Sequence, residues 1–272
     1  MSLIRLHVDE QIATLQFDHD AKRNALGAEL IDEIIAAFAE CKRQHVRAIV
    51  LRAGSGTKVW SSGHDVEELP RVGIDPLPYS DPLEVLLRAV DALPAPVIAM
   101  VHGSVWGGAC ELIMACDIVI GDESCTFAIT PTKIGVPYNI AGLQRFVSRL
   151  PLNVVKEMFF TANPITAQRA ERIGIVNAIV PADQLEEYTY GMARTIAKRS
   201  AVAIAALREQ LRILSDESVA ISPSTFEYLH GIRRDIYFGH DYEEGIRAFL
   251  EKRAPNFSGE ALEFDGRRTR EH

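Results

Sequence analysis

Ser104 to Glu111 read SVWGGACE, and this stretch stands between two apolar runs, PVIAMV before it and LIMACDIVI after it. Adjacent glycines form strands and helices poorly, so Gly107 and Gly108 mark a turn between a buried strand and a helix. A helix N-terminus presents backbone N–H groups without intrahelical partners and favours negative charge. The glycines either permit tight strand-to-helix packing or let a ligand approach those amides. The GxGxxG phosphate-binding pattern is absent.

A second turn of this kind lies upstream, in VLRAGSGTKVWSSGHDVEELP. An apolar strand is followed by a polar loop that contains Gly63, His64 and Asp65, and then by a short acidic, helix-like segment. If the strands AIVLRA and VIAMV lie side by side, the turns after them meet at one edge of the sheet. Two converging N–H groups form an oxyanion hole. The pair of turns therefore predicts such a site.

The apolar pattern changes its period along the chain. IATLQF alternates like a strand, AELIDEIIAAFAEC has the three-and-four spacing of a helix, and VRAIVLRA is typical of a buried strand. The rhythm recurs in DPLEVLLRAVDAL, PVIAMV, GGACELIMAC and DIVIG. From about Asn139 onward helical periodicity dominates, in AGLQRFVSRL, NVVKEMFF, TAQRAERIG, LEEYTYGMARTIAKR, AVAIAALREQLRIL, FEYLHGIRRDIYF and DYEEGIRAFLEKR.

The composition is that of a globular protein: 272 residues, of which 47% are hydrophobic, can bury a large core. The sequence has no window of 18 consecutive apolar residues, and MSLIRLHVDEQ lacks the basic and apolar regions of a signal peptide. We therefore expect a cytoplasmic protein that binds no membrane. The formal net charge of −8 argues against nucleic acid as a partner.

The four cysteines show neither CxxC spacing nor a metal-ligand pattern, and three of them stand inside apolar runs. We interpret them as buried thiols rather than disulfide partners or metal ligands. They are Cys41, Cys110, Cys116 and Cys125. The sequence predicts no metal site.

Six segments together resemble the crotonase (enoyl-CoA hydratase/isomerase) superfamily over nearly the whole chain: KRNAL, SSGHDVEEL, HGSVWGGACELIMACDIVI, FAITPTKIGVPYNIAGLQRF, ITAQRAERIGIVNAIV and AFLEKRAPNF. The resemblance implies an α/β (α+β), crotonase/ClpP-like fold, with repeated ββα units in two roughly perpendicular sheets, then helices that build homotrimers or homohexamers. It places the core domain at residues 1–195 and the helical trimerisation region at 196–272. It implies acyl-CoA thioester substrates, with coenzyme A as part of the substrate and no further cofactor.

Within that family, SGHDVEELP, GSVWGGA and TPTKIGVPYN are similar to the biotin-independent methylmalonyl-CoA decarboxylases. This resemblance implies that the backbone N–H groups of His64 and Gly108 form the oxyanion hole for the thioester carbonyl. The slot of His64 is commonly a small residue in the family, so its imidazole either bonds nearby backbone or belongs to the acyl pocket. Tyr138 falls where the substrate carboxylate is oriented, or is a half-buried aromatic with a hydrogen-bonded hydroxyl.

The carboxylates separate two reactions of the family, because its hydratases use two glutamates. Glu111 fills the first place, and the second, in FAITPTKIG, is Pro131, which has no proton to give. Hydration needs a positioned acid and base, whereas in decarboxylation the electrons of the breaking C–C bond flow into the thioester carbonyl. Taken alone, Glu111 also suits an ion-paired helix residue. Water, His64 and Tyr138 remain candidates for protonating the α-carbon.

The resemblance also implies how CoA is held. Lys22 and Arg23 would lie near its phosphates, and AFLEKR would come from a neighbouring subunit or from the swung C-terminal helix. Without the resemblance, a charge run such as EKR reads as a solvated face. The candidate CoA-binding residues are Lys22, Arg23, Ala25, Ser62, Asp65, Val66, Phe249 and Lys252.

Three functions follow from these observations. The leading one is decarboxylation of methylmalonyl-CoA to propionyl-CoA and CO₂, which is a carbon–carbon lyase reaction. The second is hydratase or isomerase action on an enoyl-CoA. The third is RNA binding, because the family includes an RNA-binding hydratase with a lysine-rich helix. The early helix here, GAELIDEIIAAFAECKR, is acidic until its end, which argues against it.

Overall fold

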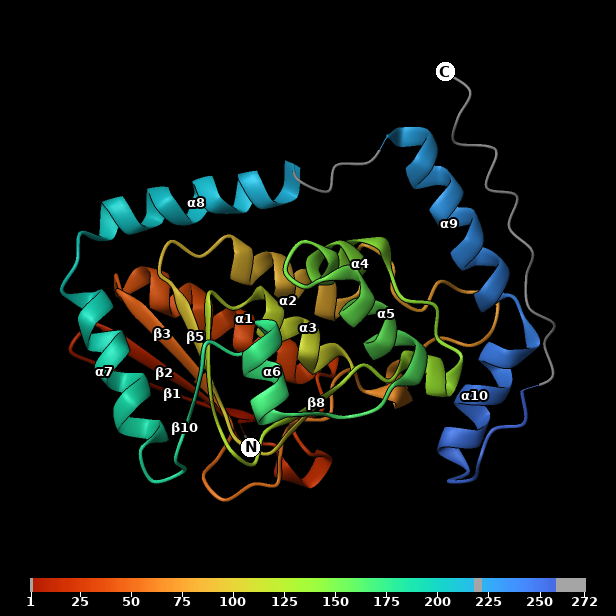
Figure 1. Cartoon of the computed structure of the whole chain (residues 1–272), viewed down its shortest axis with the longest axis horizontal. Coiled ribbons are helices and arrows are strands. Elements are labelled where there is room, and N and C mark those ends of the chain that lie inside the picture. The colour runs from red at the N-terminus through yellow and green to blue at the C-terminus, as the bar shows by residue number, and fades with distance from the viewer. Residues whose placement is uncertain (1, 218–221, 258–272) are drawn as a thin grey trace.

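The computed structural model describes residues 2–217 and 222–257, which form a mixed α/β fold built on two sheets (Figure 1). The larger sheet has the strand order β1-β2-β3-β5-β7-β10, antiparallel between β1 and β2 and parallel elsewhere. Its strands are β1 Ile4–Asp9, β2 Ile12–Phe17, β3 Ala48–Arg52, β5 Val97–Val101, β7 Ile118–Asp122 and β10 Ala178–Val180. The smaller sheet, β4-β6-β8-β9, consists of β4 Val59–Ser61, β6 Ser104–Trp106, β8 Thr126–Ala128 and β9 Ile165–Thr166.

The helices follow the expected sequence segments closely. The first three are α1 Ala28–Arg43, α2 Pro82–Asp91 and α3 Gly108–Ala115. The seven helical segments expected after Asn139 are α4 Ile140–Val147, α5 Leu152–Thr161, α6 Ala167–Ile173, α7 Leu185–Ala197, α8 Ala201–Glu217, α9 Pro223–Tyr237 and α10 His240–Leu250. Figure 1 shows α7 and α8 toward one end of the molecule and α9 and α10 toward the other. The described helices therefore confirm the sequence-based expectation.

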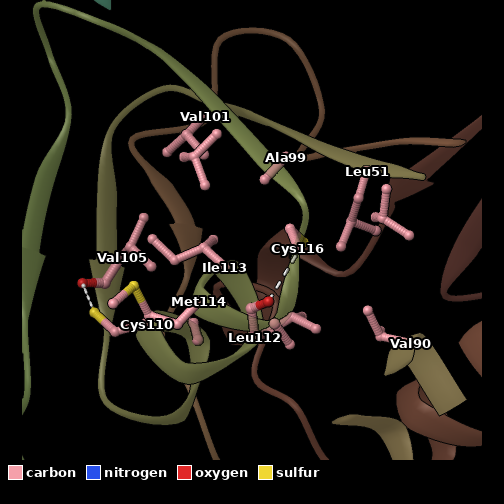
Figure 2. Close-up of a cluster of buried hydrophobic side chains, with 14 of the residues drawn as sticks. Leu51, Val90, Ala99, Val101, Val105, Cys110, Leu112, Ile113, Met114 and Cys116 are labelled. Carbon is pink, nitrogen blue, oxygen red and sulfur yellow. Dashed lines mark hydrogen bonds between the residues drawn. The ribbon is translucent and has the colours of Figure 1, made fainter. Parts of the chain in front are cut away.

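Both faces of the larger sheet are covered, which explains why β3 and β5 are buried along their whole length and are apolar except for Arg52 at the end of β3. On one face, Val50 and Ile98 pack in a cluster with Leu185 of α7. Because side chains alternate along a strand, Leu51 and Ala99 face the opposite way, into the main core with α1, α2 and α3. Figure 2 shows part of this core. The larger sheet is thus a central layer buried on both faces.

The cysteine prediction is confirmed. All four thiols are free and buried. In Figure 2, Cys110 and Cys116 lie in the core beside Val105 and Leu112, whose carbonyl oxygens accept their S–H groups at 3.3 Å in each pair. Burial raises the pKa of Cys110 and of Cys116 to about 12, so these thiols stay protonated.

The structure corrects the placement of the two glycine turns. AIVLRA and VIAMV lie side by side as β3 and β5, but from each the chain crosses to the smaller sheet before it turns. The turns follow β4 and β6, which are themselves parallel neighbours. Strands of three residues are too short to display a period, which is why they were not expected.

Two arginines cap the C-termini of α3 and α2. Arg149 donates to the carbonyl oxygens of Met114 and Cys116 at the end of α3, at 3.0 and 3.2 Å. Arg208 donates to the carbonyl oxygens of Val90, Asp91 and Leu93 at the end of α2, between 2.6 and 2.9 Å. These cations satisfy orphan carbonyls at the negative ends of the helix dipoles.

The two-domain division stays a prediction. Its boundary at residue 195 falls inside α7, whose inner face packs on the larger sheet, and the residues after 257 lie outside the described chain. Within residues 2–217 and 222–257, none of the helices has both the length and the apolar character that a bilayer crossing requires.

Candidate active site

One cavity of about 750 Å³ collects the predicted site residues. It opens beside the turns after β4 and β6 and is largely apolar, with Leu77, Leu83 and Val136 among its walls. All twelve candidate residues line it: His64, Gly108, Glu111 and Tyr138 of the catalytic set, and Lys22, Arg23, Ala25, Ser62, Asp65, Val66, Phe249 and Lys252 of the CoA set. The structure thus brings together residues that are up to 230 positions apart, while their individual roles stay predictions.

The two turns approach each other closely because of their glycines. Gly63 and Gly107 have φ values of 83° and 53°, which other residues rarely adopt. A Cβ atom on Gly63 would stand 2.8 Å from the Gly108 nitrogen, and one on Gly108 would stand 3.4 Å from the His64 nitrogen. Neither the His64 amide nor the Gly108 amide has an acceptor within the described residues. Two free donors therefore meet on the cavity wall, as an oxyanion hole requires.

The KRNAL segment fixes the first of these turns. Leu26 forms an isolated parallel bridge with His64: the Leu26 amide donates to the Gly63 carbonyl oxygen at 2.7 Å. Asn24 is fully buried, and its side-chain amide donates to the Trp60 carbonyl oxygen at 3.0 Å. Because buried polar groups are costly unless paired, these bonds hold the segment and the turn in one arrangement.

Glu111 and the half-buried Tyr138 form a hydrogen-bonded pair on the wall of the same cavity. Glu111 is 2% exposed, and its Oε2 accepts the Tyr138 hydroxyl at 2.6 Å, whereas its Oε1 is buried without a partner. Burial, followed by the charge of Glu84, raises the pKa of Glu111 to about 7. Burial likewise raises the pKa of Tyr138 well above its usual value. Near neutral pH the pair therefore holds a transferable proton on the carboxyl group.

Glu111 could have been an ion-paired helix residue, but its side chain bonds a tyrosine rather than a cation. Its hydrogen-bond partner is a phenol, and the half-buried Arg145 bonds instead to Asp91 at 2.9 and 3.2 Å. Tyr138 also packs edge-on against Phe159, with 5.0 Å between ring centroids. This contact fixes the ring that presents the hydroxyl to Glu111.

Glu84 is a second buried carboxyl group in this region. It is 6% exposed, accepts the Asn139 side-chain amide, and its pKa is raised by burial. Asn139 uses its own side-chain oxygen to cap α4 through the Gly142 amide. Unlike Glu111, Glu84 is not part of the cavity wall, so it contributes charge to the site without facing a substrate.

His64 carries an imidazole that is enclosed from two sides. Its Nε2 lies 3.0 Å from Oδ2 of Asp81 and its Nδ1 lies 3.1 Å from the Asp65 carbonyl oxygen. Burial by itself lowers the pKa of His64, but the hydrogen bond and charge of Asp81 help to outweigh it, so that the pKa is raised. The imidazole of His64 thus bonds nearby backbone and also lines the cavity.

The CoA set forms the outer part of the cavity. The Lys22 ammonium group lies 2.9 Å from the Asp65 carboxylate and 3.1 Å from that of Glu67, and these partners raise its pKa. Phe249 and Lys252 line the cavity from α10 and its C-terminal turn in the same chain, and their role in binding CoA stays a prediction. Phe249 is 51% exposed, so its ring presents apolar surface at the cavity.

Sequence reasoning missed several residues of the site. Asp81 was visible as a helix N-cap before PLEVLL, but nothing in the sequence indicated that it would meet His64. Glu84 sits in the same amphipathic helix and reads as a solvent-facing acid. Thr130 and Trp106 line the cavity from segments too short and irregular to carry a pattern.

The chain matches the model of the family described as enoyl-CoA hydratase/isomerase over residues 7–260. It is 45% identical to methylmalonyl-CoA decarboxylase from Escherichia coli over 249 residues, which are 92% of this chain and 95% of that protein. It is 30% identical to a probable enoyl-CoA hydratase from Bacillus subtilis over 96% of this chain and 100% of that one. A solved structure of methylmalonyl-CoA decarboxylase in complex with 2-nitronate-propionyl-CoA superposes with a TM-score of 0.92 at 44% identity, covering 95% of this chain and 99% of that chain.

Proposed function

The chain belongs to the enoyl-CoA hydratase/isomerase family, and from that premise we propose that it is a carbon–carbon lyase that decarboxylates methylmalonyl-CoA to propionyl-CoA and CO₂. The observation that carries the choice of reaction is the 45% identity with a methylmalonyl-CoA decarboxylase across 92% of this chain. The similarity of the solved structure supports the same assignment. The geometry of the cavity supplies the chemical reason.

The first step is cleavage of the bond between C2 and the carboxylate. Its electron pair passes to the thioester carbonyl, CO₂ leaves, and the oxygen becomes an enolate. We assign the His64 and Gly108 amides to that oxygen, because both are free donors on adjacent turns, where a Cβ placed on Gly108 would stand 3.4 Å from the His64 nitrogen. Preorganised donors of this kind stabilise the charge that develops in the transition state. The step needs neither biotin nor a metal on this proposal.

The C–C bond that breaks must stand perpendicular to the thioester plane, because only then does it overlap with the carbonyl π system. We assign this orientation to the Tyr138 hydroxyl acting on the substrate carboxylate. Its ring is held by Phe159. A protonated Glu111 can donate to the Tyr138 oxygen, which leaves the hydroxyl proton for the substrate carboxylate. The apolar walls of the cavity, including Leu77 and Val136, favour the charge-dispersed transition state over the localised carboxylate.

The enolate must then take a proton at C2, and we assign that proton to the Glu111–Tyr138 pair. The pKa of Glu111 is raised to about 7, so its carboxyl group is protonated in an appreciable fraction of molecules at neutral pH. When Glu111 is protonated, the 2.6 Å hydrogen bond reverses its direction, with the carboxyl group donating to the Tyr138 oxygen. The Tyr138 hydroxyl then gives its proton to C2 and takes the Glu111 proton in its place. Solvent then reprotonates Glu111, and atoms and charge balance.

Hydration of an enoyl-CoA is the alternative, and Glu111 together with the relatives named as hydratases favours it. However, Pro131 lines the cavity where the family resemblance expects the second glutamate. Glu84 cannot take its place, because it lies outside the cavity wall and is bonded to Asn139. We therefore expect hydration to be much slower than decarboxylation.

Self-association as a homotrimer or homohexamer belongs to the same proposal. The helix α8 exposes an apolar series in the single chain: Val202 at 82%, Leu207, Leu211 and Leu214. Apolar patches of this kind mark interfaces between subunits. The region after α7 is then the trimerisation region that the sequence suggested.

The proposal is tested by incubating the purified protein separately with methylmalonyl-CoA, malonyl-CoA and crotonyl-CoA and reading product masses. We expect propionyl-CoA and CO₂ from methylmalonyl-CoA, in the presence of EDTA and avidin and without nucleotide, and little hydration of crotonyl-CoA. A matched control is Glu187→Gln, which removes one exposed charge far from the cavity. Rapid hydration of crotonyl-CoA without CO₂ release from methylmalonyl-CoA would replace this proposal by the hydratase alternative.

A further inference from the structure

Asp81 occupies a position where one carboxylate serves two elements of the site. It is 7% exposed and is the N-cap of α2, with Oδ1 accepting the Leu83 amide at 2.9 Å. Its Oδ2 lies 3.0 Å from Nε2 of His64. The backbone amide of that same histidine is one of the two free donors on the cavity wall. The carboxylate therefore links the start of α2 to the oxyanion hole.

The hydrogen-bond geometry of His64 specifies its protonation state. Nδ1 faces a backbone carbonyl oxygen, which can only accept, and Nε2 faces a carboxylate. A neutral imidazole donates from one nitrogen only, so the other would face an acceptor. The alternative, a proton on Asp81, is disfavoured because a helix N-terminus stabilises the charged carboxylate that caps it. An imidazolium satisfies both contacts.

We propose that Asp81 is a positioning residue that holds His64 as an imidazolium ion beside the oxyanion hole, so that a fixed cation adds to the two backbone amides in stabilising the enolate. The inference rests on the proposed function for its reaction, but it makes a claim about binding of anions that stands apart from turnover. The His64 side chain begins beside the second amide, since its Cβ lies 3.8 Å from the Cβ position of Gly108. Within a cavity that excludes much of the water, such a charge is screened weakly.

The charged groups around His64 agree with this assignment. Asp81 and Glu68 face it as acids, and Glu84 and Glu111 belong to the helices α2 and α3 that begin beside it. Asp65 contributes its carbonyl oxygen to His64, while its carboxylate pairs with Lys22. Acidic groups thus predominate near the ring, and they keep the proton on it rather than remove it.

Two substitutions separate the charge of Asp81 from its structural work. Asp81→Asn keeps a capping oxygen for α2 but presents an amide to Nε2, which leaves His64 neutral. Asp81→Ser also caps a helix well but is too short to reach the ring. Glu187→Gln, which loses one charge at an exposed pair, is the matched control. Circular dichroism and thermal melts establish that each variant is folded.

The first readout is the titration of His64 by NMR in protein labelled at its histidine nitrogens, with the signal assigned by its loss in His64→Gln. We expect His64 to stay protonated to higher pH in the wild type and in Glu187→Gln than in Asp81→Asn and Asp81→Ser. Identical titration in all four proteins would overturn the proposal.

The second readout compares binding of 2-nitronate-propionyl-CoA, an anion whose charge is delocalised over its nitronate and thioester oxygens, with binding of propionyl-CoA, whose acyl group is neutral. We expect Asp81→Asn to weaken the nitronate on the order of 10-fold and to change propionyl-CoA little. Equal weakening of both ligands would assign Asp81 a purely structural role, and no weakening of either would also overturn the inference. Because neither readout uses turnover, an absence of decarboxylation would contradict the proposed function and not this inference.

Discussion

Replacement of Gly108 by alanine should separate activity from stability. The added Cβ would stand 3.4 Å from the His64 nitrogen and 2.5 Å from Cδ2 of Leu83. It would therefore fill the space in which the enolate oxygen must lie about 2.7–3.1 Å from both amides. Loss of one such donor typically lowers turnover on the order of 10²- to 10³-fold, so we expect at least the lower figure for Gly108→Ala.

The stability of this variant should change little. Alanine in place of glycine favours a helix by up to about 1 kcal/mol. Gly108 is the first residue of α3, and its φ is not in the left-handed region, so alanine fits the backbone there. The displaced methyl group of Leu83 costs on the order of 1 kcal/mol in the opposite direction. Urea unfolding and steady-state kinetics on the same preparations measure the two quantities. Gly191→Ala in α7, where the nearest atom is the end of Arg194 at 3.9 Å, is the matched control.

The double variant Gly108→Ala, Leu83→Ala decides what the loss means. It relieves the contact with Leu83 but leaves the new methyl group between the amides, so turnover should stay low. Recovery of turnover in the double variant would show that a displaced leucine, rather than a blocked oxyanion hole, caused the loss. Turnover within about tenfold of the wild type in Gly108→Ala alone would refute the assignment of the two amides.

Three further outcomes are expected. Glu111→Gln should be more stable than the wild type above neutral pH, because the raised pKa of Glu111 makes the native wild type lose stability as pH rises from 4.5 to about 7. The variant should gain about 3 kcal/mol in the free energy of unfolding at pH 8 and almost nothing at pH 4. Equal unfolding curves for the two proteins at pH 8 would contradict this expectation. Tyr138→Phe should lower the rate of decarboxylation while the affinity for propionyl-CoA changes little. It should also raise the pKa of Glu111 further, because the Tyr138 hydrogen bond lowers that pKa in the wild type. Equal losses of affinity and turnover would assign the tyrosine to packing. Sedimentation at micromolar concentration should give a species of about three or six times 30.1 kDa, and a 30.1 kDa species alone would count against assembly.

The sequence predicted well those parts of the fold that long periodic segments build. The helices from α1 to α10 and the strands β2, β3, β5 and β7 follow from apolar spacing over five or more residues. The smaller sheet was missed because β4, β6 and β8 each have three residues, over which alternation and chance look alike. Yet that sheet carries the two turns of the site.

The candidate site divides in the same way. The glycine turns predicted converging amides from local chemistry alone, and the resemblance supplied Tyr138 and the CoA set. The contact of Asp81 with His64 and the burial of Glu84 beside Glu111 depend on how α2 packs. Such tertiary contacts leave no mark on spacing or composition, so sequence reasoning could not reach them.

The bridge between Leu26 and His64 joins the segment with the predicted CoA-binding residues to the turn that carries one amide of the oxyanion hole. Lys22 and Arg23 precede this bridge by only a few residues, and the Arg23 carbonyl oxygen also accepts the Ser62 amide at 2.9 Å. A change in this segment, to which we assign the CoA phosphates as a prediction, would therefore strain the turn that holds the His64 amide. For protein engineering, it follows that affinity for CoA and catalysis at the thioester cannot be changed independently by altering this segment. A loop graft that changes one of them must preserve the backbone on which the other depends.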